Sequence, residues 1–527
     1  MSATVNAPQG SFFGHPKGLS TLFFTEMWER FSFYGLRPLL VLFMAAAVMQ
    51  GGWGWDRGEA SAIVGIYAAM VYLASLPGGW VADKWLGLRK ATLYGGALIS
   101  LGHITIGASA FTSSKVPFFL GLVFIVLGTG LLKPNISAMV GDLYPEGGAR
   151  KDAGFSIFYM GINLGAFIGQ LITGYLGESV GWHWGFTAAG VAMILGLIQF
   201  YLMAPRTLGD IGLEPSRHPD PAIQAKQVTT VKMATFGGLA VLAVVFFLVA
   251  SGTIPFSAEV FGTYLAYILV GIGFVYFAYL LLLGGLNSDE KKRVLVIAVL
   301  FVFAAIFWSA FEQTPTALNL FALDFTERMV GTFEIPATWF QSVNSFWIIL
   351  LAPVIAAFWT FLGSKKINLS SPVKFAIGLG FAALSFVVMI FASYIVVGEG
   401  TVATKVSPLW LVTFYLFLTL GELFVSPVGL SSMTTLSPKR YVGQMMGIWF
   451  LASSVGNLIG GLVGGEVDPE NLSAMPRLFT TTTMFLGGAA LVLIILSVPI
   501  SKMMAGREAV PESGETDAEA AVKSEVE

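Results

Sequence analysis

Long apolar stretches alternate with short polar segments along almost the whole chain of 527 residues. Fourteen of these stretches are close to or longer than the ~20 residues that a helix needs to cross a bilayer. Lipid offers the backbone no hydrogen-bond partners, so each stretch should form a helix. The predicted spans are 20–49, 58–83, 91–112, 116–140, 153–177, 183–204, 233–251, 260–286, 293–322, 337–362, 372–397, 407–434, 441–465 and 475–501.

One polar loop, residues 205–227, is much longer than the others and is rich in proline, as is typical of a linker. The two spans after it, 233–251 and 260–286, contain no buried charge. The other twelve spans divide into six before the linker and six after this hairpin. Two six-helix halves with a site between them near the membrane midplane are typical of transporters built from repeats.

We therefore predict an all-α polytopic membrane protein. Its expected parts are an N-terminal cytoplasmic tail (1–18), a six-helix bundle (19–205), a cytoplasmic linker (206–230), an inserted transmembrane hairpin (231–288), a second six-helix bundle (289–503) and an acidic cytoplasmic tail (504–527). The last part lacks aromatic residues, so we expect it to be disordered.

The basic residues of the loops predict the orientation. Lysine and arginine gather in alternate loops, at 83–90, 149–152, 289–293, 363–366 and 437–440, whereas the opposite loops at 251–259, 397–400 and 465–471 are poor in them. Cytoplasmic loops carry an excess of basic residues. We expect the basic side to be cytoplasmic, with both termini there because the number of spans is even.

The composition excludes several classes of protein. Hydrophobic residues make up 55% of the chain and charged residues 11%, whereas a soluble protein carries about 25% charged residues. The net charge of −2 suggests no nucleic-acid partner. The chain has no cysteine, which excludes disulfides, thiolate metal sites and cysteine nucleophiles. We expect neither a cofactor nor a metal.

The first span nevertheless carries four charges, Glu26, Glu29, Arg30 and Arg37. At about 100° per residue they share one side of the helix with Phe33 and Tyr34. A charge at the bilayer centre costs about 2.5–3.5 kcal/mol on insertion scales, so this stripe should face protein or water. An internal network that only holds helices together is the alternative to a functional role.

Three further charges stand alone in their spans: Lys133, Glu312 and Glu422. Each needs a partner on another helix, because an unpaired buried charge is expensive. Lys133 and Glu422 lie in different halves, so we expect them to pair when the cavity is empty and closed on the inside. Together with the first span the inventory is three bases and four acids. The surplus buried carboxylate is a natural proton acceptor.

Several motifs resemble the proton-coupled oligopeptide transporters, a branch of the major facilitator superfamily. "EMWERFSFYG" (26–35) resembles the first-span motif of that family, and "FSIFYMGINLGAF" (155–167) resembles its second signature. "GGWVADKWLGLRK" (78–90), "GTGLLKPNIS" and "GELFVSPVGL" also match in kind and place. The resemblance covers about residues 20–500. The hairpin at 233–286 is similar to the two extra helices of bacterial members, which implies a bacterial inner membrane.

The resemblance implies proton-driven import of di- and tripeptides by a monomer. Arg30 and Lys133 would bind the peptide carboxylate, and Glu422 would bind its amino group. The other residues that would line the pocket are Tyr34, Arg37, Tyr72, Asn163, Trp308, Asn344 and Trp449. The residues expected in proton coupling are Glu26, Glu29, Arg30 and Glu312, and the expected gate salt bridges are Arg37–Glu312 at the outer end and Lys133–Glu422.

Departures from the family pattern leave alternatives open. Phe33 stands where the motif usually has tyrosine, so one pocket hydroxyl is missing, and Phe311 stands where some members have a second glutamate. No histidine lies in the first or second span, which makes nitrate a less favoured cargo and leaves the coupling to carboxylates. The same fold carrying nitrate or another small organic anion or zwitterion is the second hypothesis. A polytopic membrane enzyme is a remote third, because no catalytic motif is present.

Overall fold

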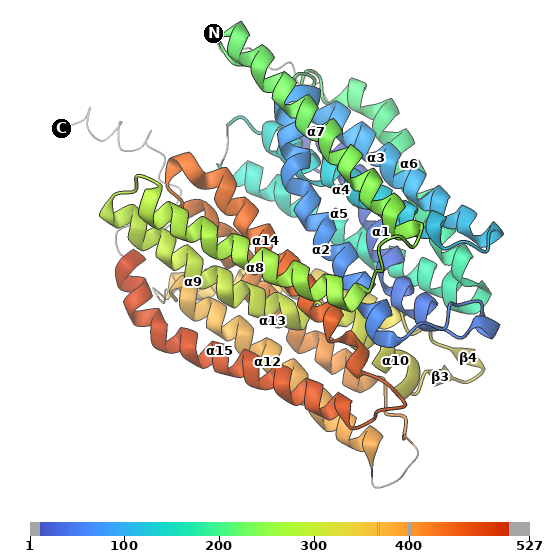
Figure 1. Cartoon of the computed structure of the whole chain (residues 1–527). Coiled ribbons are helices and arrows are strands. Elements are labelled where there is room, and N and C mark those ends of the chain that lie inside the picture. The colour runs from blue at the N-terminus through green and yellow to red at the C-terminus, as the bar shows by residue number, and fades with distance from the viewer. Residues whose placement is uncertain (1–10, 147, 366, 368, 399–402, 505–527) are drawn as a thin grey trace.

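The computed structural model describes residues 11–504 except 147, 366, 368 and 399–402. Fourteen long helices make up almost all of this described part (Figure 1). They are α1 (Gly18–Ala45), α2 (Arg57–Val81), α3 (Leu88–Ala108), α4 (Val116–Asp142), α5 (Gly148–Tyr175), α6 (Trp182–Thr207), α7 (Pro221–Ala250), α8 (Ala258–Leu283), α9 (Ser288–Phe311), α11 (Trp339–Ser364), α12 (Ser371–Val397), α13 (Leu409–Thr435), α14 (Val442–Leu462) and α15 (Ala474–Met504).

Thirteen of the described helices are long and apolar enough to cross a membrane. The fourteenth long helix is α1, and every stretch of 18 residues within it contains at least three charged residues. The predicted all-α polytopic fold is confirmed, with fourteen long helices in the described part of the chain. The charges that set α1 apart are also the ones that the sequence places on a single stripe.

Short elements join the long helices. They are the strands β1 (Ser11–Phe12), β2 (His15–Pro16), β3 (Met329–Val330) and β4 (Phe333–Glu334), the helix α10 (Asn319–Phe325), the π-helical turns η2 (Ala82–Leu86), η4 (Leu176–Val180) and η5 (Thr314–Leu318), and the 3₁₀ turns η1 (Val48–Gln50), η3 (Ser109–Phe111), η6 (Lys439–Tyr441) and η7 (Gly464–Glu466). Strands β1 and β2 form an antiparallel pair within the predicted N-terminal tail, which the sequence did not reveal. Disorder is predicted for the C-terminal tail, residues 504–527; Met504 instead ends α15, and residues 505–527 lie outside the described residues.

The linker is shorter than the predicted 206–230, because α7 already begins at Pro221. The Asp220 side chain caps this helix by accepting a hydrogen bond of 2.8 Å from the Ala222 N–H. Proline is favoured in the first turn, where its missing N–H costs no helical bond. The apolar pattern predicted that this span starts at residue 233, because the first turns of α7 are polar and precede the apolar run.

The ninth predicted span, 293–322, consists of two consecutive helices joined by a π-helical turn. Helix α9 begins earlier, at Ser288, where Asn287 and Glu290 form a capping box. It ends at Phe311, and the turn η5 precedes the short helix α10. Pro315 in η5 lacks the N–H that a continuous α-helix would use. This break lies directly after Glu312.

The first six long helices lie together on one side of the molecule and α9–α15 on the other, as the blue-to-teal and yellow-to-red ribbons show (Figure 1). Helix α8 of the inserted hairpin contacts α2 of the first group and α14 of the second. The β3–β4 pair and α10 lie at one end of the bundle (Figure 1). We call this the α1–α2 end, because the α1–α2 loop lies there as well, and we call the opposite end the α2–α3 end.

Small residues bring α1 against α5. A Cβ atom built on Gly165 would lie 2.2 Å from the Met27 carbonyl oxygen, and one on Gly169 would lie 2.6 Å from the Phe31 carbonyl oxygen. Only glycine permits such contact of two helix backbones. This packing brings the backbones of α1 and α5 into direct contact, and the charged stripe of α1 is buried in the interior.

Candidate functional site

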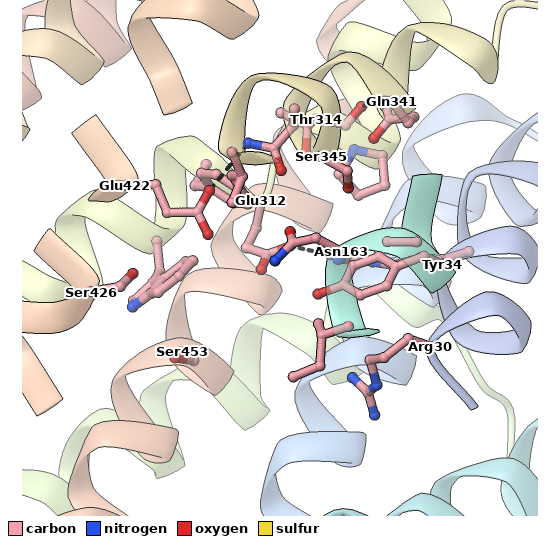
Figure 2. Close-up of a pocket in the computed structure, with 18 of the residues that line it drawn as sticks. Arg30, Tyr34, Asn163, Glu312, Thr314, Gln341, Ser345, Glu422, Ser426 and Ser453 are labelled. Carbon is pink, nitrogen blue, oxygen red and sulfur yellow. Dashed lines mark hydrogen bonds and ion pairs between the residues drawn. The ribbon is translucent and has the colours of Figure 1, made fainter. Parts of the chain in front are cut away.

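A cavity of about 280 Å³ lies between the two groups of helices. Figure 2 shows Arg30 and Tyr34 on α1 and Asn163 on α5 facing Glu312, Glu422 and Ser426 from the second group. The sequence-predicted residues that line it are Glu26, Arg30, Tyr34, Arg37, Tyr72, Lys133, Asn163, Trp308, Glu312, Asn344, Glu422 and Trp449. Glu29 is the predicted site residue that does not line the cavity, since it is fully buried behind Arg30.

The first group of helices supplies the basic wall. The Nε atom of Arg30 lies 3.1 Å from a carboxylate oxygen of Glu26 and also forms an ion pair with Glu29. Both pairs use Nε, and Nη2 of Arg30 is buried with no hydrogen-bond partner among the described residues. Lys133 places its ammonium group 4.0 Å from the ring centre of Tyr72, a cation–π contact. In the described part of the chain, no ion pair of Lys133 is present.

The second group supplies the acidic wall. Glu422 on α13 accepts a hydrogen bond of 3.1 Å from Asn344 on α11, which also donates to the Thr419 hydroxyl at 3.0 Å. Within the described residues Glu422 has no cationic partner, so the predicted Lys133–Glu422 salt bridge is absent in this conformation. Both charges are therefore available to a ligand in the cavity.

Aromatic side chains form much of the remaining wall. Trp308 and Trp449 meet edge to face with ring centres 6.5 Å apart, and the rings of Tyr72 and Phe450 stack at 6.3 Å. Rigid aromatic rings with few fixed polar groups accommodate varied side chains.

The Arg37–Glu312 salt bridge is present and joins the two groups of helices. Arg37 on α1 pairs with Glu312 at the end of α9, and the same Nη2 atom donates a hydrogen bond of 2.7 Å to Oδ1 of Asn457 on α14. Asn457 is 1% exposed. Arg37 and Glu312 also line the cavity.

Two further polar links close the α1–α2 end. Arg57 on α2 donates to Asp324 on α10 at 2.6 Å and to the carbonyl oxygen of Val467 at 3.1 Å. Glu178 in η4 accepts bonds of 2.7 and 2.9 Å from the Ala337 and Thr338 N–H groups, and one of 2.7 Å from the Thr338 hydroxyl. Each link joins a residue of the first group to a residue of the second.

Glycines allow the helix backbones to meet at the same end. A Cβ atom on Gly65 of α2 would lie 2.7 Å from the Asn457 carbonyl oxygen and 2.9 Å from the Cα atom of Gly461. The contacts of α2 with α14 and of α5 with α11 thus complete the closure. The conformation is one in which the α1–α2 end is sealed above the cavity.

Comparison with known proteins identifies the family of this chain. The sequence profile described as the POT family matches residues 89–475. The chain belongs to the POT family. The peptide transporter YePEPT of Yersinia enterocolitica is 50% identical over 509 residues, which cover 96% of this chain and 98% of that protein. The di-/tripeptide transporter of Lactococcus lactis subsp. cremoris is 36% identical over 95% of this chain and 99% of its own.

Solved structures of POT proteins superimpose closely on this family member. A peptide transporter POT in complex with sulfate is 40% identical, with a TM-score of 0.86, and the match covers 95% of this chain and 98% of that one. A POT family transporter in complex with 5-aminolevulinic acid is 34% identical with a TM-score of 0.84, over 94% and 99% of the two chains. The predicted family and the major facilitator fold are confirmed, and the chain is a transporter and not an enzyme.

The sequence did not reveal every residue of the site. Additional polar residues that line the cavity are Tyr159, Gln170, Thr314, Gln341, Ser345, Tyr415, Ser426 and Ser453. Several of these stand alone as polar residues in apolar spans, which is the signal that could have marked them. The Tyr415 hydroxyl, the Ser426 hydroxyl and Nε1 of Trp308 have no partner in the part of the chain that the structure describes. They are free to bond a ligand.

Proposed function

We propose that this POT family member imports di- and tripeptides together with protons by alternating access. The observation that carries the proposal is the pair of opposed charged walls around one cavity: Arg30 and Lys133 face Glu422 without a salt bridge between them. A short peptide is a zwitterion and offers a carboxylate to the basic wall and an ammonium group to the acidic wall. A volume of about 280 Å³ suits a few residues and not a long chain.

Peptide side chains would occupy the space between these two anchors. The aromatic groups of Tyr72, Trp308 and Trp449 line it, and they make apolar contact with little demand for one chemical type. The two ends of the peptide are common to all di- and tripeptides, whereas the side chains vary. Fixed charges for the ends and adaptable rings for the middle therefore explain a broad range of peptides.

Proton coupling is proposed for the carboxylates that hold the two arginines. Protonation of Glu26 or Glu29 would weaken the hold on Arg30, and protonation of Glu312 would remove the charge that fixes Arg37. A proton thus acts on the same groups that bind peptide or close the cavity. Breaking a buried pair typically costs about 3–5 kcal/mol, enough to change a conformational balance of a few kcal/mol.

The proposed orientation follows the basic loops, which favour a cytoplasmic location in a bacterium for the α2–α3 end and both termini. The α1–α2 end is then the outer end. Its closure supports a cavity sealed from outside in this conformation, and the absence of the Lys133–Glu422 pair agrees with an inner end that is not closed. That pair remains a prediction for the conformation closed on the inside, and we propose that the protein works as a monomer.

A small anion such as nitrate is the second candidate cargo, and the site favours it less. Nitrate would satisfy Arg30 or Lys133 and would leave Glu422 with only the amide of Asn344. A zwitterionic organic molecule of similar size would fit both walls and is therefore a stronger alternative to peptides than nitrate.

Uptake into proteoliposomes tests the proposal. Labelled dialanine should accumulate when the outside is acidic, and unlabelled di- and tripeptides should compete, whereas free amino acids and nitrate should not. Glu422→Gln should lose competition by zwitterionic peptides, while the buried variant Ser385→Ala on α12 serves as the matched control. Saturable nitrate current with no competition by dialanine would contradict the peptide assignment.

A further inference from the structure

Arg37 has two acceptors of different kinds. The Nη2 atom of its guanidinium group pairs with the carboxylate of Glu312 and donates 2.7 Å to the amide oxygen of Asn457. Arg37 belongs to the first group of helices, and both acceptors belong to the second. One acceptor can take up a proton and lose its charge. The other is neutral at every pH at which a protein is folded.

Asn457 is held in one orientation. Its Nδ2 atom donates 2.8 Å to the Ser453 carbonyl oxygen one turn earlier on α14, so the amide oxygen faces Arg37. The backbone around it is also fixed, because a Cβ atom on Gly460 would lie 2.7 Å from the Glu312 carbonyl oxygen. Helix α14 therefore presents Asn457 and supports Glu312 as one rigid unit.

We infer that Asn457 is a positioning residue of the proton-linked outer gate. It holds the Arg37 guanidinium group against Glu312 while Glu312 is ionised. Because it is uncharged, it retains too little attraction to keep the gate closed once Glu312 is protonated. This inference rests on the proposed proton coupling at Glu312, and it assigns to the neutral amide the role of setting the pH at which the gate opens.

Variants of residue 457 can test the effect of its charge on the gate, because the other charged and titratable groups around Glu312 stay unchanged. Those that act on Glu312 from the surrounding helices are Arg37 and Tyr34 on α1, Tyr72 on α2, Lys133 on α4 and Glu422 on α13. None of them is changed in the variants below. A change in the pH dependence of the gate therefore reports on residue 457.

Asn457→Asp should shift gate opening to more acid pH. Two carboxylates would then share Arg37, and a proton on one would let it donate a hydrogen bond to the other and stabilise the remaining charge. The wild-type amide cannot do so in its observed orientation, since its Nδ2 atom faces Ser453. We expect the midpoint to fall by at least about one pH unit, tenfold in proton concentration. Only the second proton should open the gate, because two carboxylates that share a site take up their protons in separate steps.

Asn457→Leu should shift the midpoint the other way. The side chain keeps a similar volume and loses the acceptor, so Glu312 alone holds Arg37 and the gate opens at higher pH. In a third variant, Glu312→Gln removes the carboxylate and should open the gate at all pH values tested. Combining Glu312→Gln with Asn457→Asp should restore a pH-dependent closed state, since the carboxylate at 457 already lies within bonding distance of Arg37.

The gate is measured by double electron–electron resonance on the full chain in nanodiscs, without peptide. The chain has no cysteine, so Met49→Cys and Val330→Cys add the only labelling sites. Both residues are exposed, in the α1–α2 loop and on β3 respectively. Distance distributions are recorded from pH 4.5 to 8.5, and Ser385→Ala, a buried hydroxyl within α12, is the control expected to match wild type.

Opposite shifts for Asn457→Asp and Asn457→Leu, with recovery of closure in the double variant, would support the role. A shift in the same direction for both variants, or no acid shift for Asn457→Asp, would overturn it, and the aspartate result decides alone if the leucine variant does not fold. A wild-type gate with no pH dependence would overturn the proton-linked gate and the inference with it. A pH-dependent wild type with an unshifted aspartate variant overturns only the role of Asn457.

Discussion

The closed α1–α2 end depends on a glycine whose replacement should force it open. Gly65 on α2 faces the backbone of α14, and an added methyl group would lie 2.7 Å from the Asn457 carbonyl oxygen and 2.9 Å from the Cα atom of Gly461. Neither atom belongs to a flexible side chain, so the helices themselves must separate. Gly65→Ala should therefore disfavour the conformation in which α2 and α14 touch.

The size of the effect follows from this overlap. Inserting a methyl group into a well-packed interface costs about 1–3 kcal/mol. Alanine also stabilises an exposed helix by about 0.5–1 kcal/mol relative to glycine, but this gain is the same in both conformations and cancels. The ratio of molecules closed at the α1–α2 end to molecules open there should therefore fall by about 5- to 150-fold.

The same pair of spin labels, at Met49→Cys and Val330→Cys, measures this ratio at a pH where both distances are resolved. Gly65→Ala should increase the population at the longer distance. Gly488→Ala on α15 is the matched control, because no atom of a neighbouring described element lies within 4 Å of the position that its added methyl group would take. An unchanged distribution for Gly65→Ala, or an equal change for Gly488→Ala, would refute the reasoning.

Three other predictions follow from individual contacts. Glu422→Gln should weaken dipeptide binding by about 10- to 150-fold, the range for a lost charged hydrogen bond of about 1.5–3 kcal/mol, and a binding titration would contradict this if affinity were unchanged. Glu29→Gln should abolish accumulation driven by a proton gradient and keep peptide exchange between equal pools, so accumulation that persists would transfer the coupling role to another carboxylate. Glu178→Gln should weaken the link to the start of α11 and lengthen the outer-end distance, whereas an unchanged distance would show that the other links suffice.

The apolar pattern of the sequence alone located the membrane helices. Fourteen runs correspond to fourteen long helices, because a span must be both helical and apolar whatever it packs against. The boundaries shifted where capping residues extended a helix beyond its apolar run, as at Asp220 and Asn287. The break after Glu312 was not predicted, since a single proline does not reveal where a helix resumes.

The charged residues were identifiable for a similar reason. An ionised side chain in a span is costly, so Arg30, Lys133 and Glu422 stand out in a sequence even without a fold. Their motifs also resemble one family, which the profile match confirms. The bonding partners of these residues could not be predicted, because local spacing in the sequence does not show which residues of other helices lie nearby.

Only the tertiary structure decided which of these groups meet. Arg37 and Asn457 are 420 positions apart in the sequence, yet Nη2 of Arg37 lies 2.7 Å from Oδ1 of Asn457. Glu29 does not line the cavity, although it lies on the same side of α1 as residues that do. Lys133 and Glu422 form no ion pair with each other in the described conformation, which spacing within either helix could not predict. The hydropathy of each helix can be read from its own sequence. These contacts instead depend on how α1, α9 and α14 pack together, which is determined by glycine contacts and buried charges from distant parts of the chain.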